Sequence, residues 1–162
     1  MFVDENDIPI GTGSRQIAWQ RGYFTRNIRV IIRDESNRFL CQKRSLHKDS
    51  YPGMWTVAAS GHVDDGETWD DAAKRETLEE IGISINVKSV GQFTFKDDIG
   101  NKKIRQIVHV YEASVDSLTQ FVTDQDEVDK VEWFHLDELK SLIAKDSSQF
   151  TPSLIEVVKV YY

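Results

Sequence analysis

The sequence predicts an α/β fold in which helices cover both faces of a mixed β-sheet. Runs with β-branched or aromatic residues recur at 25–33 and 128–134, as is typical of strands. Helical patterns with capping residues at 68–82 and 137–145 alternate with such runs. No internal repeat, linker or low-complexity tract divides the 162 residues, which are enough to bury one core. We therefore expect a single domain, residues 1–162, built as an α/β/α sandwich.

Residues 1–22 are expected to form a hairpin followed by a short helix. Two extended runs flank a turn at Glu5, Asn6 and Asp7. Ser14 can cap a helix that Gly22 closes, because serine accepts N-terminal amide hydrogen bonds and glycine tolerates a left-handed helix end. The next expected elements are a strand at 25–33, a turn at 34–37, a strand at 38–43, a loop at 44–50, a turn at 51–53 and a strand at 54–59.

The second half of the chain is expected to add further strands and two more helices. A proline follows Thr151, and proline after a capping threonine predicts a C-terminal helix. The β-branched Val157, Val158 and Val160 disfavour that helix. The other expected elements are strands at 83–87, 90–96, 104–113 and 128–134, a turn at 97–101, a loop at 116–126 and a helix at 137–145.

The helix at 68–82 carries an unusual charge pattern. Its capping residues are Thr68, Asp71 and Gly82, and its core-facing stripe is Ala73, Thr77 and Ile81. Beside the stripe, Glu76, Glu79 and Glu80 share one face at i, i+3 and i+4. Each like-charge pair costs about 3 kcal/mol at about 6 Å and an effective dielectric of about 20. A bound divalent cation replaces this repulsion with attraction between the ion and each carboxylate. Ligands that are all oxygen atoms suit Mg²⁺.

A motif of fixed spacing runs from the preceding loop through this helix. It reads Gly61, five residues, Glu67, seven residues, Arg75-Glu76, then Glu79-Glu80, one residue, Gly82 and Ile83. Residues 61–83 therefore resemble the Nudix box, Gx5Ex7REUxEExGU, with Thr77 at an aliphatic position as the one departure. A solvated acidic face is the alternative for a lone pair of glutamates, but it does not explain the whole spacing. The resemblance implies a Nudix-type α/β/α sandwich with a mixed β-sheet.

Segments outside the box are similar to the isopentenyl-diphosphate-isomerase-like branch of the Nudix superfamily. These segments are 3–6, 39–45 with Lys48, 51–55, 126–128 and 150–152. True isomerases of this branch carry a catalytic cysteine just before the box glycine, where this chain has Ser60. Thr25 stands where they have an upstream histidine, and Gln125 stands where their late Glu-x-Glu pair begins. A hydroxyl does not replace a thiol in proton transfer at carbon, so a hydrolase is expected rather than an isomerase.

The resemblance to Nudix hydrolases implies roles for the box residues. Glu79 and Glu80 are expected to coordinate Mg²⁺, and Glu76 to be a further ligand or the base that activates water. The Gly61 carbonyl is a candidate ligand. For Glu67, a second metal ion and bracing of the loop remain equal alternatives.

The remaining candidate residues surround the metal site. Arg75 is expected to orient carboxylates, and Arg44 and Lys48 to hold substrate phosphate, with solvated loop cations as the alternative for both. The resemblance also places Glu127 at the metal cluster or the attacking water. His62 is expected to be a hydrogen-bonded loop histidine rather than a ligand.

The composition of the chain restricts the classes of partner and the cellular location that we expect. The net charge of −7 argues against general binding to nucleic acid or anionic membranes. Cys41 is the sole cysteine and is expected to be a small buried hydrophobe. With no signal peptide in the first ten residues, a cytoplasmic location is expected. The oligomeric state stays open, with a homodimer among the alternatives.

The expected activity is Mg²⁺-dependent hydrolysis of a phosphoanhydride bond, with Mn²⁺ as a substitute. The expected substrate is a small phosphorylated compound, either a nucleoside diphosphate derivative or a nucleoside di- or triphosphate. The alternatives are an isopentenyl-diphosphate isomerase and a Nudix module that binds nucleotide without turnover.

Overall fold

The computed structural model describes residues 1–162, and its main sheet is mixed, as the sequence predicts. The central strand β3 (Thr25–Arg33) runs parallel to β8 (Lys102–Ser114) and antiparallel to β4 (Phe39–Arg44). Five strands follow the order β5-β4-β3-β8-β7, while β6 also pairs with β3 and β9 with β4. The other bounds are β1 Phe2–Val3, β2 Pro9–Gly11, α1 Arg15–Arg21, β5 Trp55–Val57, β6 Ala59–His62, α2 Trp69–Ile81, β7 Lys88–Ile99, β9 Val128–Phe134, α3 Leu136–Lys145, the 3₁₀ turn Ser147–Gln149 and α4 Pro152–Tyr161.

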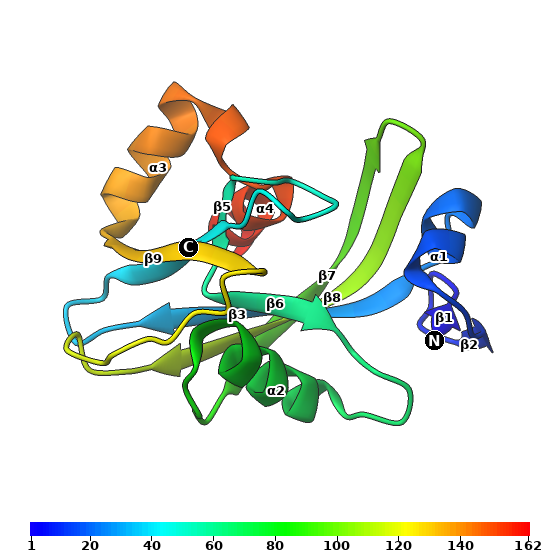
Figure 1. The fold of residues 1–162 in the computed structure, drawn as a ribbon, viewed down its shortest axis with the longest axis horizontal. Coiled ribbons are helices and arrows are strands. Elements are labelled where there is room, and N and C mark those ends of the chain that lie inside the picture. Colours follow the sequence, from blue (N-terminus) through cyan, green and yellow to red (C-terminus); the bar gives the residue numbers. More distant parts are fainter.

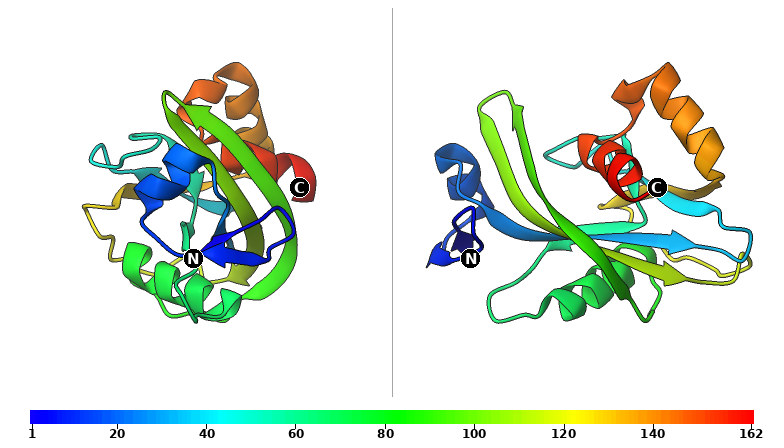
Figure 2. Two further views of the ribbon diagram at one scale, coloured as in Figure 1. Left: turned by 90° about the vertical axis from the view of Figure 1, so that its right-hand side faces the viewer. Right: turned by 180° about the vertical axis from the view of Figure 1, so that it is seen from behind.

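Helices cover both faces of this sheet (Figure 1). Side chains alternate between the faces of a strand, so Val30 and Ile32 of β3 face α2, whereas Ile31 faces α3 and α4. The α2-side core includes Ala72, Ala73 and Ile81, and the opposite core includes Leu139, Leu154, Val157 and Val158. The expected sandwich is confirmed, with α2 on one face and α3 and α4 on the other in every view of Figure 2.

Helix α2 begins and ends at its predicted capping residues. The Thr68 hydroxyl accepts a hydrogen bond from the Asp71 amide at 3.2 Å. Gly82 adopts a left-handed φ of 74° and donates to the Leu78 carbonyl. The inner stripe is fully buried in the α2-side core, which leaves the glutamate face directed away from it. The N-terminal helix and the C-terminal helix α4 are confirmed as well.

Two expected strands are corrected by the structure. Residues 83–87 pair with no strand, because their apolar side chains pack on the α2-side core as the chain connects α2 to β7. The expected strand at 54–59 bends at Ala58 into β5 and β6. Since β5 pairs with β4 whereas β6 pairs with β3, this division depends on partners that a local pattern does not reveal.

The β7–β8 hairpin is longer than expected. Pairing continues to Ile99 and Lys102, so the turn is confined to Gly100 and Asn101 rather than spanning 97–101. Gly100 has a φ of 59°, a left-handed value that glycine adopts without strain. The hairpin extends beyond the other strands toward α1 (Figure 1), which places its residues beside the cleft described below.

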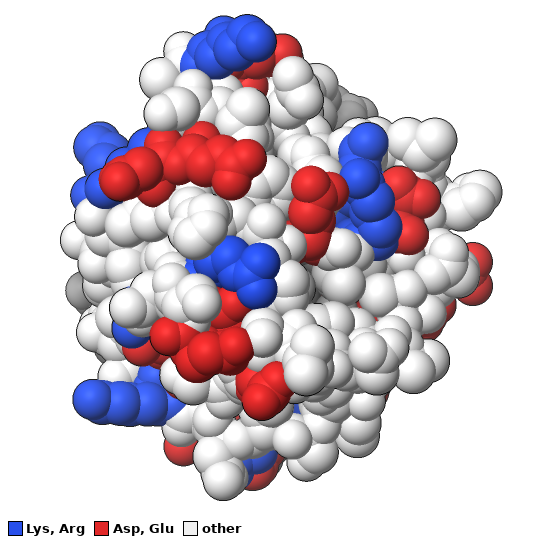
Figure 3. Space-filling view, turned by 90° about the vertical axis from the view of Figure 1, so that its left-hand side faces the viewer, with Lys and Arg blue, Asp and Glu red and all other residues white.

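The molecular surface carries charges of both signs. On the face shown in Figure 3, acidic and basic side chains are interspersed rather than gathered into separate regions. No helix combines the length and the hydrophobicity needed to cross a membrane.

Candidate active site

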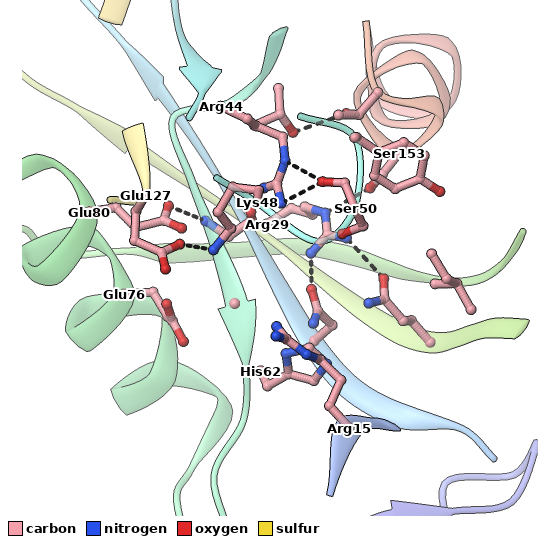
Figure 4. A pocket seen from close by; sticks show the side chains of 18 of the residues that line it. Arg15, Arg29, Arg44, Lys48, Ser50, His62, Glu76, Glu80, Glu127 and Ser153 are labelled. Atoms are coloured by element: carbon pink, nitrogen blue, oxygen red, sulfur yellow. Dashed lines mark hydrogen bonds and ion pairs between the residues drawn. The ribbon is translucent and has the colours of Figure 1, made fainter. Parts of the chain in front are cut away.

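A cleft of about 400 Å³ lies where α2 approaches β6. Of the 23 residues that line it, only four are hydrophobic. Its carboxylates include Glu76, Glu79, Glu80 and Glu127, and its cations are Arg15, Arg29, Arg44 and Lys48. Figure 4 shows Glu76 and Glu80 on the helix side of β6 and Arg29, Arg44 and Ser153 beyond it. The cleft therefore has an acidic wall, formed by the α2 glutamates, and a basic wall.

Glu80 is the most buried carboxylate of the acidic wall, with 4% of its surface exposed. Its Oε2 accepts hydrogen bonds from the Ser60 amide at 2.9 Å and from Gln42 Nε2 at 2.6 Å, whereas Oε1 accepts none. Burial raises the pKa of Glu80 to about 8, and the nearby charge of Glu76 adds to the rise. One oxygen is thus anchored and the other remains available.

Glu76 occupies space that only a glycine at position 61 leaves open. A Cβ on Gly61 would lie 1.9 Å from the Glu76 carboxyl carbon, so any side chain there would displace this carboxylate. Burial raises the pKa of Glu76 to about 7, although Arg75 donates to its Oε1 at 2.8 Å. The box glycine therefore provides the space in which Glu76 reaches the cleft.

Arg75 connects three glutamates of the motif. Its guanidinium binds both oxygens of Glu67 at 2.9 Å, Glu76 at 2.8 Å and Glu79 at 3.1 Å. Neither Arg75 nor Glu67 lines the cleft. This arrangement favours bracing of the loop over a second metal ion as the role of Glu67.

The two candidate phosphate-binding residues differ in their partners. Arg44 donates to the Ser50 carbonyl at 3.1 and 3.0 Å and has no carboxylate partner, and burial lowers its pKa. Lys48 forms an ion pair with Glu127. This pair joins the loop after β4 to the loop before β9, so Glu127 lines the cleft together with the α2 glutamates.

Arg29 is a cleft residue that sequence reasoning missed. It is 7% exposed, and burial lowers its pKa to about 10, with the charge of Arg44 acting in the same direction. The only signal in the sequence is an arginine between Ile28 and Val30 in an apolar strand.

The sequence predicts a hydrogen-bonded loop histidine at position 62, and the structure corrects this prediction. Its imidazole makes no hydrogen bond, and its pKa is lowered to about 4 by burial and then by the charges of Arg15 and Arg29. The cause is its position at the end of β6, which directs the ring into the cleft beside these cations.

The carboxylates of the acidic wall carry the oxygen donors that a hard cation prefers. No three His, Cys, Asp or Glu side chains come close enough together to hold a metal ion, and Arg75 holds Glu76 and Glu79. Glutamate oxygens are nevertheless the donors that Mg²⁺ prefers, and Glu80 offers a free Oε1. Glu76, Glu79 and Glu80 therefore offer donors of the right kind for Mg²⁺, although this arrangement does not bring three of them together.

Replacing Gly61 by alanine tests how closely the loop and Glu76 fit. The added methyl group is expected to displace the Glu76 carboxylate and to destabilise the protein by about 1–3 kcal/mol, as overpacking does. Activity should fall more than this loss of stability explains. Urea unfolding and kcat measured together check the result.

Gly66→Ala is the control for this substitution. Gly66 lies in the same loop with a left-handed φ of 83°, and nothing lies within 4 Å of the place that an added methyl group would take. The control therefore strains the backbone without touching Glu76. Equal losses of activity in the two variants would contradict the expectation.

Comparison with known proteins agrees with the geometry of the site. The NUDIX domain family matches residues 23–154. The chain is 30% identical over 160 residues to a prenyl-diphosphate phosphatase from Methanosarcina mazei, covering 98% of this chain and 92% of the relative. It is also 30% identical over 140 residues to isopentenyl-diphosphate Delta-isomerase 2 from Aromatoleum aromaticum, covering 86% and 73%. A solved structure from Deinococcus radiodurans superposes with a TM-score of 0.83 at 23% identity, covering 99% and 97%. The chain therefore belongs to the NUDIX family, in its isopentenyl-diphosphate-isomerase-like branch, and is a Nudix hydrolase.

Proposed function

We propose that this enzyme hydrolyses a phosphoanhydride bond of a small diphosphate-containing compound with Mg²⁺, for which Mn²⁺ substitutes. The observation that carries the proposal is the acidic wall facing a basic wall across one cleft. Glu76 and Glu80 supply oxygen ligands, whereas the buried Arg29 and the half-buried Arg44 supply positive charge with no carboxylate partner. A metal ion compensates the charge of the acidic wall, and a phosphorylated substrate compensates the charge of the basic wall.

The residues of the cleft divide the work of hydrolysis. A bound Mg²⁺ would neutralise charge on the non-bridging phosphate oxygens. Arg44 and Lys48 bind the phosphate, and Arg75 keeps Glu76 and Glu79 in position. The proton of the attacking water passes to a carboxylate oxygen of Glu76 or Glu127, both of which line the cleft. Ser60 takes part through its backbone amide, which holds Glu80 Oε2.

The polar lining of the cleft favours a nucleoside diphosphate derivative or a nucleoside di- or triphosphate as substrate. A prenyl diphosphate is the second candidate. It is supported by the relative from Methanosarcina mazei and by the four hydrophobic side chains, Trp19, Tyr51, Phe95 and Ile104. These four offer a surface for either a base or a short isoprenyl group.

A substrate panel tests the proposal. Nucleoside di- and triphosphates, isopentenyl diphosphate and geranyl diphosphate are incubated with Mg²⁺, and phosphate release is measured with and without excess chelator. We expect release from at least one class, its loss in chelator, and no conversion of isopentenyl diphosphate to its dimethylallyl isomer.

The panel has three outcomes that contradict this proposal. Release that persists in chelator contradicts the metal requirement. Enzyme-dependent formation of the dimethylallyl isomer contradicts the assignment as a hydrolase. Nucleotide binding without any turnover identifies a binding module instead.

A further inference from the structure

Arg29 is a buried cation that the protein does not neutralise. No carboxylate lies within ion-pair distance of its nitrogens, and the carboxylates that pair with the other arginines all lie elsewhere. Its hydrogen bonds go to neutral acceptors: Nε donates to Ser153 Oγ at 2.7 Å, Nη1 to the Ile28 carbonyl at 2.8 Å and to Asn27 Oδ1, and Nη2 to Gln106 Oε1 at 3.0 Å. Buried charges are normally paired, so this cation leaves a place for an anionic partner from outside the chain.

The three side chains that accept hydrogen bonds from Arg29 keep hydrogen-bond donors of their own free. Because the amide oxygens of Asn27 and Gln106 accept from Arg29, their NH₂ groups are turned the other way, and neither donates to the protein. Ser153 Oγ likewise accepts from Arg29 and keeps its hydrogen free. One of the two N–H groups of Arg29 Nη2 also has no hydrogen-bond acceptor. All four residues line the cleft.

The N-terminus of helix α4 adds to the positive environment of Arg29. Thr151 caps the helix, Pro152 follows, and Ser153 stands in its first turn. The helix has ten residues, and helix N-termini carry partial positive charge that favours anions. The helix therefore acts in the same direction as Arg29.

We propose that Arg29, Asn27, Gln106 and Ser153 form a second anion subsite, which binds a phosphate group of the substrate away from the acidic wall. Phosphate oxygens are acceptors only and match a wall of donors around a guanidinium. A nucleobase presents donors as well as acceptors, and a metal ion would be repelled. The subsite deepens the function proposed above, and naming its ligand as substrate phosphate rests on that function.

The position of the subsite fits one substrate spanning both walls. Arg29 on β3 stands opposite Ser60 on β6, and the Ser60 amide holds Glu80. Neighbouring strands lie about 4.8 Å apart. One phosphate at Arg29 and another at the acidic wall are thus within the reach of a single diphosphate or triphosphate chain.

The test measures binding of inorganic phosphate to the metal-free protein in excess chelator, by calorimetric titration. Gln106→Glu keeps the shape of the side chain and supplies Arg29 with the missing carboxylate. We expect phosphate binding at least about tenfold weaker than wild type, from loss of charge-assisted hydrogen bonds, together with a higher Tm. Asn27→Asp places a carboxylate on Nη1 instead and should give the same result. Gln20→Glu, an equal change of charge on the exposed face of α1, should change neither quantity.

The outcomes separate this inference from the proposed function. Wild-type phosphate binding by both carboxylate variants, or no binding by the wild-type protein in chelator, overturns the subsite even if hydrolysis is observed. Phosphate binding that both variants lose supports the subsite even if no diphosphate in the panel is hydrolysed. Glu80→Gln should retain phosphate binding in chelator, because Glu80 does not contact these four residues.

Discussion

Replacing Glu80 by glutamine is expected to lower kcat by at least about a thousandfold while leaving the fold intact. A metal ligand contributes several kcal/mol of transition-state stabilisation, and each 1.36 kcal/mol corresponds to about a tenfold change in rate. The fold should survive because a glutamine carbonyl at Oε2 still accepts from the Ser60 amide and from Gln42. Steady-state kinetics at saturating Mg²⁺ measures the effect, with the exposed Glu132→Gln as control.

The same variant is expected to change how the stability of the metal-free protein depends on pH. The pKa of Glu80 is raised from its ordinary value of 4.5 to about 8 in the folded protein, so the folded state binds the proton more tightly than the unfolded state. The contribution of Glu80 to stability is therefore full below pH 4.5 and is lost as the pH rises through 8. Glutamine lacks this titration.

Urea unfolding in chelator at pH 5 and pH 9 checks this dependence. Glu80→Gln should resemble wild type at pH 5 and be more stable at pH 9, by a few kcal/mol at most. In the kinetic experiment, a kcat of Glu80→Gln near that of wild type would show that Glu80 is not a metal ligand. A variant that is less stable at pH 9 would show that its carboxylate does not carry the expected electrostatic cost.

Replacing Glu127 by glutamine is expected to lower kcat by about 10²–10⁴-fold, as loss of a general base or of a carboxylate held in the site does. Glu127 lines the cleft and pairs with Lys48, although 38% of its side chain is exposed. The loop should keep its shape, because the Ser45 amide bonds to the backbone carbonyl of Glu127 and not to its side chain. The measurement is kcat at saturating Mg²⁺.

Asp126→Asn provides the matched control for Glu127. Asp126 is the preceding residue of the same loop, is exposed, does not line the cleft and makes no side-chain hydrogen bond. It should change kcat little and the free energy of unfolding by less than about 0.5 kcal/mol. Small, equal effects in both variants would identify Glu127 as an ordinary surface charge.

The sequence by itself determined the features that depend on neighbours along the chain. The limits of α2 follow from Thr68 and Gly82, and its buried stripe and glutamate face follow from helical periodicity. Residues 61–83 were enough to identify the family, since loop and helix positions repeat at fixed spacing. The side chains of the acidic wall were therefore predictable before any tertiary contact was known.

Only the tertiary structure decided which distant residues complete the cleft. Arg29 meets Gln106 across 77 positions and Ser153 across 124, because β3 and β8 pair in parallel and α4 begins beside them. The division of 54–59 into two strands depends on different pairing partners in the same way. The need for glycine at position 61 became explicable only once Glu76 was seen to occupy the space of its missing side chain. Local patterns encode helix caps and faces, whereas strand pairing and close packing are set by contacts between segments far apart in the chain.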